Sequence, residues 1–151
     1  MLEHGGRLLA AAAHYGIAAE DWLDLSTGIA PHAYPVPPIP SAAWQRLPED
    51  EDGLAAAACR HYGARRVLPL PGSQAAIRAL PHLRAPGVAL VPEPSYAEYA
   101  AAWSAAGHML RRCDAADLAQ AAAGADAVML GNPNNPDGQR FSQRTLLDLA
   151  Q

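Results

Sequence analysis

The sequence contains no lysine, because all eleven of its lysine and arginine positions are arginine. The lysine amine is the side chain that forms covalent imines with carbonyl compounds during catalysis. No side chain of this chain can therefore act as that nucleophile. A mechanism that requires such an amine must obtain it from outside these 151 residues.

Cysteines and long apolar runs are also scarce. The two cysteines, Cys59 and Cys113, lie far apart and fit neither a disulfide framework nor a paired-cysteine metal site. We therefore expect free thiols, a reducing compartment and no metal. The amino terminus has no cleavable apolar segment, and charges interrupt the alanine-rich stretches, so we expect neither a secretory signal nor a membrane span. These features predict a cytoplasmic protein.

Clustered positive charge is missing as well. The formal net charge is −4 and the arginines are scattered, whereas nucleic-acid-binding surfaces concentrate basic residues. We therefore expect no nucleic-acid partner. In contrast, 50% of the residues are hydrophobic, which is enough to build a folded core.

The chain does contain an alternation of short apolar segments and helical patterns. This order predicts an α/β fold with a mainly parallel sheet and flanking helices. The chain ends inside the last helical pattern, with no cap at that end and no returning strand, so we expect a truncated domain. The expected helices cover residues 8–15, 41–47, 54–62, 73–83, 96–106, 115–123 and 145–151, and the expected strands cover residues 22–25, 67–70, 87–91, 108–111 and 127–130.

Three segments follow expected strands, and ligands of open α/β sheets bind beyond the carboxyl ends of strands. In residues 71–74, Gly72 allows close backbone approach, and the free N–H groups with the Ser73 hydroxyl could bind an anion. The alternative is that Ser73 only caps a helix. In residues 92–96, Tyr96 could stack on a flat heterocycle or simply pack on the next helix. Residues 131–138 carry three asparagine amides, for which a generic Asn-Pro turn is the alternative.

Taken together, these segments resemble the class I and II aminotransferases and other fold-type I enzymes that depend on pyridoxal 5′-phosphate (PLP). The Asn-Pro-x-Asn-Pro-x-Gly pattern at 132–138 carries the resemblance, with Gly-Ser-Gln at 72–74 and Pro-Ser-Tyr at 94–96 in the same order. Residues 4–6, 22–29, 34–37 and 68–83 further resemble the threonine-phosphate decarboxylases of cobalamin biosynthesis. The resemblance covers nearly the whole chain. It implies part of the large PLP-binding domain at 46–151, and an amino-terminal arm with part of the small domain at 1–45.

The resemblance implies three kinds of cofactor contact. Gly72, Ser73 and Gln74 would hold the PLP phosphate. Tyr96 would stack on the pyridine ring, and Asn135 would hydrogen-bond the phenolic oxygen O3′.

The resemblance also implies two substrate contacts. The Gly28 backbone would lie near the substrate carboxylate, and His4 would help to bind the substrate phosphate. Two positions depart from the family pattern. Asp137 replaces the usual threonine or serine, which removes a hydroxyl contact, and Ala30 replaces an asparagine before Pro31, which puts one substrate contact in question.

The implied activity is that of a PLP-dependent carboxy-lyase. It would convert threonine phosphate, a small phosphorylated amino acid, into aminopropanol phosphate, and the full-length protein would be a homodimer. The family's Schiff-base lysine, its aspartate partner of the pyridine nitrogen and its anion-binding arginines lie further along such proteins. We therefore assign no catalytic residue here and predict that this chain alone is inactive. Two alternatives stay open: part of a histidinol-phosphate aminotransferase-like transaminase, and a non-catalytic α/β binding module.

Overall fold

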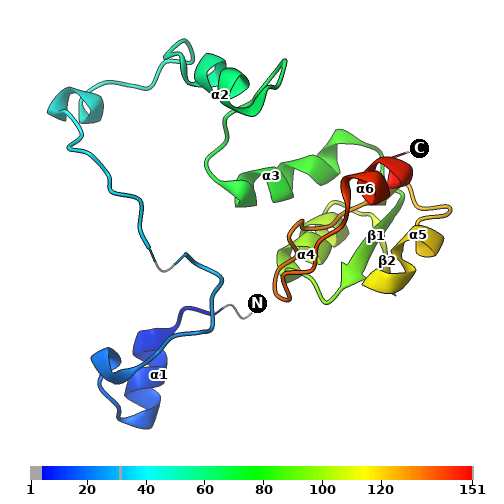
Figure 1. Cartoon of the computed structure of the whole chain (residues 1–151), viewed down its shortest axis with the longest axis horizontal. Helices are drawn as coiled ribbons and strands as arrows, with labels where there is room; N and C mark the ends of the chain where they lie inside the picture. The colour runs from blue at the N-terminus through cyan, green and yellow to red at the C-terminus, as the bar shows by residue number, and fades with distance from the viewer. Residues whose placement is uncertain (1–4, 31, 151) are drawn as a thin grey trace. The chain divides into compact units, whose positions relative to one another are not determined.

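The computed structural model describes residues 5–30 and 32–150. These residues divide into two compact units, one comprising Met1–Ile29 with Ile77–Gln151 and the other comprising Ala30–Ala76. Figure 1 traces the chain through both units.

A three-stranded parallel sheet forms the centre of the first unit. Its middle strand is β1 (Val88–Glu93), which pairs with β2 (Met109–Asp114) on one side and β3 (Ala127–Val128) on the other. Ala89 of β1 is in register with Leu110 and with Ala127. This order makes β1 the strand on which the whole sheet depends.

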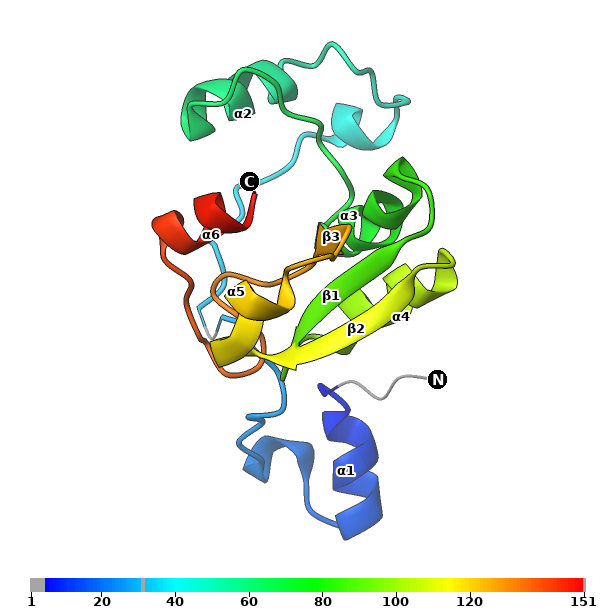
Figure 2. The same cartoon turned by 90° about the vertical axis from the view of Figure 1, so that its right-hand side faces the viewer.

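The helices between the strands cover the two faces of this sheet. Helix α4 (Ala97–Ala105) connects β1 to β2, and η4 (Ala115–Asp117) with α5 (Leu118–Ala121) connects β2 to β3. Right-handed crossovers that run in opposite directions place their helices on opposite faces. Figure 2 shows this arrangement, with α5 in front of the sheet and α4 behind it.

The core is centred on β1. Ala89 and Leu90 are 0% exposed and Val91 is 1% exposed, so consecutive residues of this strand are buried. Such a run is typical of a strand that is covered on both faces. Trp103 of α4 and Leu118 of α5 are the buried side chains that these two helices contribute.

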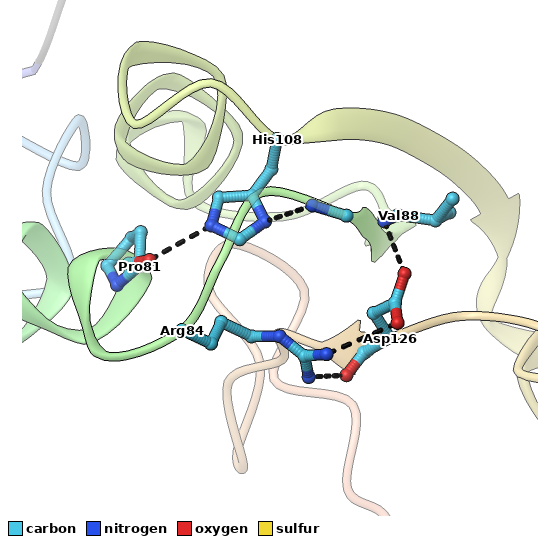
Figure 3. Close-up of polar contacts among 6 residues, drawn as sticks. Pro81, Arg84, Val88, His108 and Asp126 are labelled. Atoms are coloured by element: carbon cyan, nitrogen blue, oxygen red, sulfur yellow. Dashed lines mark hydrogen bonds and ion pairs between the residues drawn. The ribbon is translucent and has the colours of Figure 1, made fainter.

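A buried histidine connects the sheet to the segment that precedes it. His108, which is 5% exposed, accepts a hydrogen bond from the Gly87 N–H at Nδ1 (3.2 Å), and its Nε2 lies 2.9 Å from the Pro81 carbonyl oxygen. Because a carbonyl only accepts, the ring proton is on Nε2. The imidazole and the Trp103 indole also pack edge to face, with the ring centroids 4.5 Å apart. Figure 3 shows His108 between these two backbone groups.

A second polar contact joins β1 to the start of β3. Asp126 accepts a hydrogen bond from the Val88 N–H at 2.8 Å through Oδ2. Arg84 donates to the Asp126 carbonyl oxygen and forms an ion pair with its carboxylate (Figure 3). Both polar contacts lie where the strands begin, so they leave the carboxyl ends of the strands available for other groups.

The other helices do not connect strands of this sheet. Within the described part of the chain, none of the helices is long and apolar enough to span a membrane. The helices that do not connect strands are α1 (Leu8–Tyr15), η1 (Ala19–Asp21), η2 (Ser41–Trp44), α2 (Leu54–Tyr62), α3 (Ser73–Ala79), η3 (Leu80–Leu83) and α6 (Gln143–Leu149).

The parallel α/β fold expected from the sequence is confirmed, but two expected strands are wrong. Residues 22–25 form no strand, and Leu23 and Leu25 are 79% and 80% exposed. Residues 67–70 form no strand either, since Pro69 lacks the N–H that a ladder requires and Leu68 is 79% exposed. Both segments are apolar in composition, but among the described residues no neighbouring strand pairs with either of them.

Several helix boundaries also differ from the expectation. The helix expected at 73–83 changes into the 3₁₀ helix η3 at Leu80, next to Pro81, and the one expected at 41–47 is only the 3₁₀ helix η2. The last helix begins before the expected Thr145, because the Ser142 hydroxyl caps it by accepting from the Thr145 N–H at 3.0 Å.

Candidate functional site

Two loops meet at the carboxyl edge of the sheet. The first follows β1 and contains Pro94 and Tyr96, and the second, residues 131–138, follows β3. Because β1 and β3 are parallel neighbours, their carboxyl ends lie at the same edge. In Figure 2 the chain after β3 passes the end of the sheet toward which the arrows of β1 and β2 point.

Hydrogen bonds within the second loop fix its shape. The Asn132 amide pairs in both directions with the Phe141 backbone, donating to its carbonyl at 3.1 Å and accepting from its N–H at 3.0 Å. The Asn134 N–H donates to the Gln139 carbonyl at 2.7 Å, and the Gly138 N–H donates to the Asn134 carbonyl at 2.9 Å. The loop is therefore closed at its base and again near its tip.

Asn134 connects the two loops. Its side-chain Nδ2 donates to the Pro94 carbonyl at 2.8 Å and to Asp137 Oδ1 at 2.7 Å. The residue is 9% exposed, whereas Asn132 and Asn135 on either side are exposed. A single buried amide thus joins the segment after β1 to the segment after β3.

Aromatic packing brings Tyr96 against the same region. The rings of Tyr96 and Tyr99 meet edge to face, with centroids 5.6 Å apart, and Tyr96 is half-buried. A Cβ atom added at Gly131 would lie only 3.1 Å from the Tyr99 hydroxyl oxygen. Glycine at 131 therefore permits Tyr99 of α4 to lie against the loop that carries the asparagines.

Asn135 differs from its two asparagine neighbours. Its side chain is exposed, and among the described residues it has no hydrogen-bond partner. Asn132 and Asn134 have their amides engaged within the protein. Of the three amides, that of Asn135 alone is left to bind a ligand at this edge.

Asp137, which replaces the hydroxyl residue of the family pattern, takes part in the hydrogen bonds of this loop. Its carboxylate accepts from the Gln139 N–H at 3.0 Å and from Asn134 Nδ2, so the acid supplies the turn with an acceptor of its own. The backbone hydrogen bond from Gln139, followed by the bond from Asn134, lowers the pKa of the Asp137 carboxyl.

This lowered pKa gives a testable pH dependence. A carboxyl with a lowered folded-state pKa stabilises the folded loop above the unfolded-state pKa, and the contribution is lost as pH falls through the folded pKa. We expect the Asp137 carboxyl to titrate below an unstructured aspartate in a ¹³C NMR titration. Asn134→Ala should raise that midpoint only part of the way, because the larger contribution from Gln139 remains. A wild-type midpoint equal to that of an unstructured aspartate would contradict the contact.

The predicted phosphate-binding segment belongs to the other unit. Gly72 has φ +82°, and a Cβ atom there would meet nothing within 4 Å, so the residue has the conformation and open surroundings that close ligand approach requires. Ser73 is exposed and begins α3, and Gln74 is half-buried. The relation of these residues to Tyr96 and Asn135 stays a prediction.

The predicted substrate contacts lie in the amino-terminal segment. Gly28 is exposed with open space around its Cα, and His4 lies outside the described residues. The arm after His4 is held by a turn, in which the Ser26 hydroxyl accepts from the Gly6 N–H at 2.8 Å and donates to Asp24 at 2.6 Å. The Ser26 hydroxyl and then its N–H lower the pKa of Asp24.

Sequence reasoning did not identify Asn134, Tyr99 or Asp24 as structural partners of the candidate residues. The Asp-x-Ser spacing at 24–26 is a recognisable turn signal, since an aspartate often accepts from the N–H two residues ahead. The burial of Asn134 could not be predicted from the neighbouring sequence, because its side chain donates to the carbonyl of Pro94, forty residues away.

Comparisons with known proteins give similarities over most of the chain. The profile of the family "Aminotransferase class I and II" matches residues 48–151. Threonine-phosphate decarboxylase from Pseudomonas aeruginosa is 55% identical over 147 residues, which cover 97% of this chain and 44% of that protein. The protein of the same name from a Sinorhizobium species is 44% identical over 154 residues, covering 97% of this chain and 45% of the relative.

Among solved structures, a putative PLP-dependent β-cystathionase from Corynebacterium diphtheriae is similar in fold. It superimposes with a TM-score of 0.58 at 25% identity, over 72% of this chain and 34% of that one. The chain therefore spans less than half the length of the curated relatives that it matches.

Proposed function

Because this chain belongs to the class I and II aminotransferase family, we propose that it forms part of a PLP-dependent enzyme that decarboxylates threonine phosphate to aminopropanol phosphate. The observation that carries this proposal is the similarity, over 97% of the chain, to two proteins that are both named threonine-phosphate decarboxylase. The identities of 55% and 44% favour this activity over that of a transaminase. The family membership also argues against a non-catalytic binding module.

Two residues at the carboxyl edge of the sheet, Tyr96 and Asn135, support a PLP site there. PLP, when bound, supplies the electron sink into which the bond to the departing carboxylate releases its electrons. The half-buried Tyr96 ring would stack on the pyridine face and shield it from water. The exposed Asn135 amide, which has no partner within the described chain, would donate to O3′.

The other predicted contacts involve the cofactor phosphate and the substrate. The N–H groups of residues 72–74 and the Ser73 hydroxyl would hold the cofactor phosphate. The Gly28 backbone would orient the substrate carboxylate, and His4 would contact the substrate phosphate. The covalent anchor has to come from a lysine outside this chain, because the chain has none.

Asn135 and Tyr96 would act by holding the cofactor in position and would not transfer a proton. A donor to O3′ stabilises the ionised oxygen and keeps the ring oriented. Stacking on Tyr96 would hold the ring plane so that the substrate carboxylate can lie perpendicular to it, which is a matter of orientation. Neither Asn nor a ring face needs to change its protonation state for this.

The direct test is an assay of the full-length protein that contains this chain. With PLP and threonine phosphate, we expect CO₂ and aminopropanol phosphate without any keto-acid acceptor, and no turnover by the 151-residue chain alone. Turnover that depends on a keto acid and yields its amino acid would identify a transaminase and refute the decarboxylase proposal.

Asn135→Ala should lower the turnover of that full-length enzyme by about 10- to 100-fold, which is the effect of losing a hydrogen bond to a charged oxygen. Gln143→Ala removes an exposed amide that makes no hydrogen bond among the described residues, so it serves as the matched control. It should stay within about twofold of wild type. Equal activities of the two variants would exclude Asn135 from the site.

We further propose that the full-length enzyme is a cytoplasmic homodimer with a small phosphorylated amino acid as its substrate. The family resemblance supports this assembly, and sedimentation equilibrium of the full-length protein tests it.

We also propose that the boundary between the small and the PLP-binding domains lies near residue 45.

A further inference from the structure

We propose that Asn134 and Asp137 are positioning residues, which together hold the neighbouring Asn135 amide at the place where it meets the cofactor. The inference rests on the proposed function, because it concerns the same cofactor site. Its basis is the set of hydrogen bonds that joins the loop after β3 to the segment after β1.

Asn134 donates with both of its side-chain hydrogens to groups on different segments. One goes to the Pro94 carbonyl at 2.8 Å, and the other to Asp137 Oδ1 at 2.7 Å. Pro94 is forty residues earlier in the chain and stands two residues before Tyr96. The amide therefore sets the separation between the loop that carries Asn135 and the segment that carries Tyr96.

The orientation of this amide is unambiguous. A carbonyl and a carboxylate only accept, so a rotation of the amide that exchanged its oxygen and nitrogen would face oxygen against oxygen at both partners. Asn134 Oδ1 is buried and has no donor among the described residues, which shows that the amide is held by its two donated bonds. An aspartate at this position, although equal in size, would repel both partners.

The backbone transmits the position of Asn134 to Asn135. Two backbone bonds, to the Gln139 carbonyl and from the Gly138 N–H, fix the main chain of Asn134. Consecutive Cα atoms are about 3.8 Å apart, so Asn135 cannot move independently of a neighbour that is held in this way. A displacement of about 1 Å at a group that contacts the reacting centre is enough to cost substantial rate.

Asp137 acts on Asn135 through Asn134. Its carboxylate accepts from Asn134 Nδ2 and from the Gln139 N–H at the same oxygen, which fixes the turn that follows Asn135. The acid thereby takes over a structural role at the position where the family pattern has a hydroxyl. An asparagine at 137 could still accept both bonds through its carbonyl oxygen, whereas an alanine could accept neither.

The test uses the full-length protein loaded with PLP and measures two properties besides activity. One is the dissociation constant for PLP, and the other is the pH midpoint of the bound cofactor's visible absorption. A hydrogen bond donated to O3′ favours its ionised form and lowers this midpoint, so losing the bond raises it. A variant that only loses stability reduces the amount of folded protein without moving the midpoint.

We expect Asn135→Ala to raise the midpoint by about one pH unit and Asn134→Ala to raise it by about half a unit. Asn134→Ala should also weaken PLP binding about tenfold. Asn134→Asp should be at least as harmful as Asn134→Ala, since it keeps the size and removes the donor. Asp137→Asn should remain close to wild type, Asp137→Ala should shift in the same direction as Asn134→Ala, and the control Gln143→Ala should not shift.

The inference is overturned if Asn134→Ala and Asn134→Asp retain the wild-type midpoint and PLP affinity while Asn135→Ala changes both. It is also overturned if Asn134→Asp behaves like wild type while Asn134→Ala does not, because packing rather than donation would then be responsible. Failure of the proposed function gives a different result, in which the wild-type full-length protein itself binds no PLP or does not release CO₂ from threonine phosphate.

Discussion

Replacing His108 with alanine is expected to lower the free energy of unfolding by about 2–4 kcal/mol, because it leaves two hydrogen-bonding groups unpaired and removes a buried ring. The Gly87 N–H loses its acceptor, and the Pro81 carbonyl loses its donor. The ring is 5% exposed, so water cannot easily substitute for it. Urea unfolding of the full-length protein measures the change (Figure 3 shows the contacts that are lost).

Two further variants separate the causes of this loss. His108→Phe keeps a ring beside Trp103 but leaves the same two backbone groups unpaired, so it should remain destabilised by about 1–3 kcal/mol. His82→Ala removes an exposed histidine from the adjacent η3 and should change stability by less than about 0.5 kcal/mol. If His108→Ala were no more harmful than His82→Ala, His108 would not connect the segments before the sheet.

Leu90→Ala is expected to cost about 2–5 kcal/mol, the usual range for truncating a fully buried leucine. Leu90 is 0% exposed in the middle of β1, between β2 and β3, so the cavity cannot be filled by movement of a free surface. The same unfolding experiment measures it, with thermal melting as a second reading.

Leu83→Ala is the matched control for this prediction. Leu83 is 79% exposed, so the same deletion of side-chain carbons should change the free energy of unfolding by less than about 0.5 kcal/mol. Similar losses for the two variants would contradict the assignment of β1 as the centre of the core. The stability of β1 also matters for the candidate site, because β1 ends at Glu93, directly before Pro94.

The strands that pair were predictable from their composition. β1 and β3 lie in apolar segments, β2 begins with two apolar residues before Arg111 and Arg112, and the parallel arrangement follows from the alternation of strands with helical patterns. The segments at 22–25 and 67–70 have similar composition but pair with nothing. A short apolar run is compatible with a strand, and only a hydrogen-bonding neighbour makes it one.

The candidate site was predictable in its general position and only partly in its residues. The pattern at 132–138 and its place after a buried strand indicated a ligand-binding loop. The hydrogen bonds of Asn132 and Asn134 were not predictable, because they depend on groups that only folding brings close to these side chains. Asn132 pairs with the Phe141 backbone, and Asn134 donates to the Pro94 carbonyl and to Asp137.

By itself, the sequence determined the fold class, the membership of the family and the absence of a lysine that could anchor a cofactor. These properties depend on residue types and their order, and the chain carries both directly. The tertiary structure decided which of three identical amides is engaged with the protein and which one faces outward. It also decided that Asp137 accepts a hydrogen bond from Asn134 and thereby stabilises its loop. The physical reason is that hydrogen bonds form between atoms that folding brings within about 3 Å, whatever their separation along the chain.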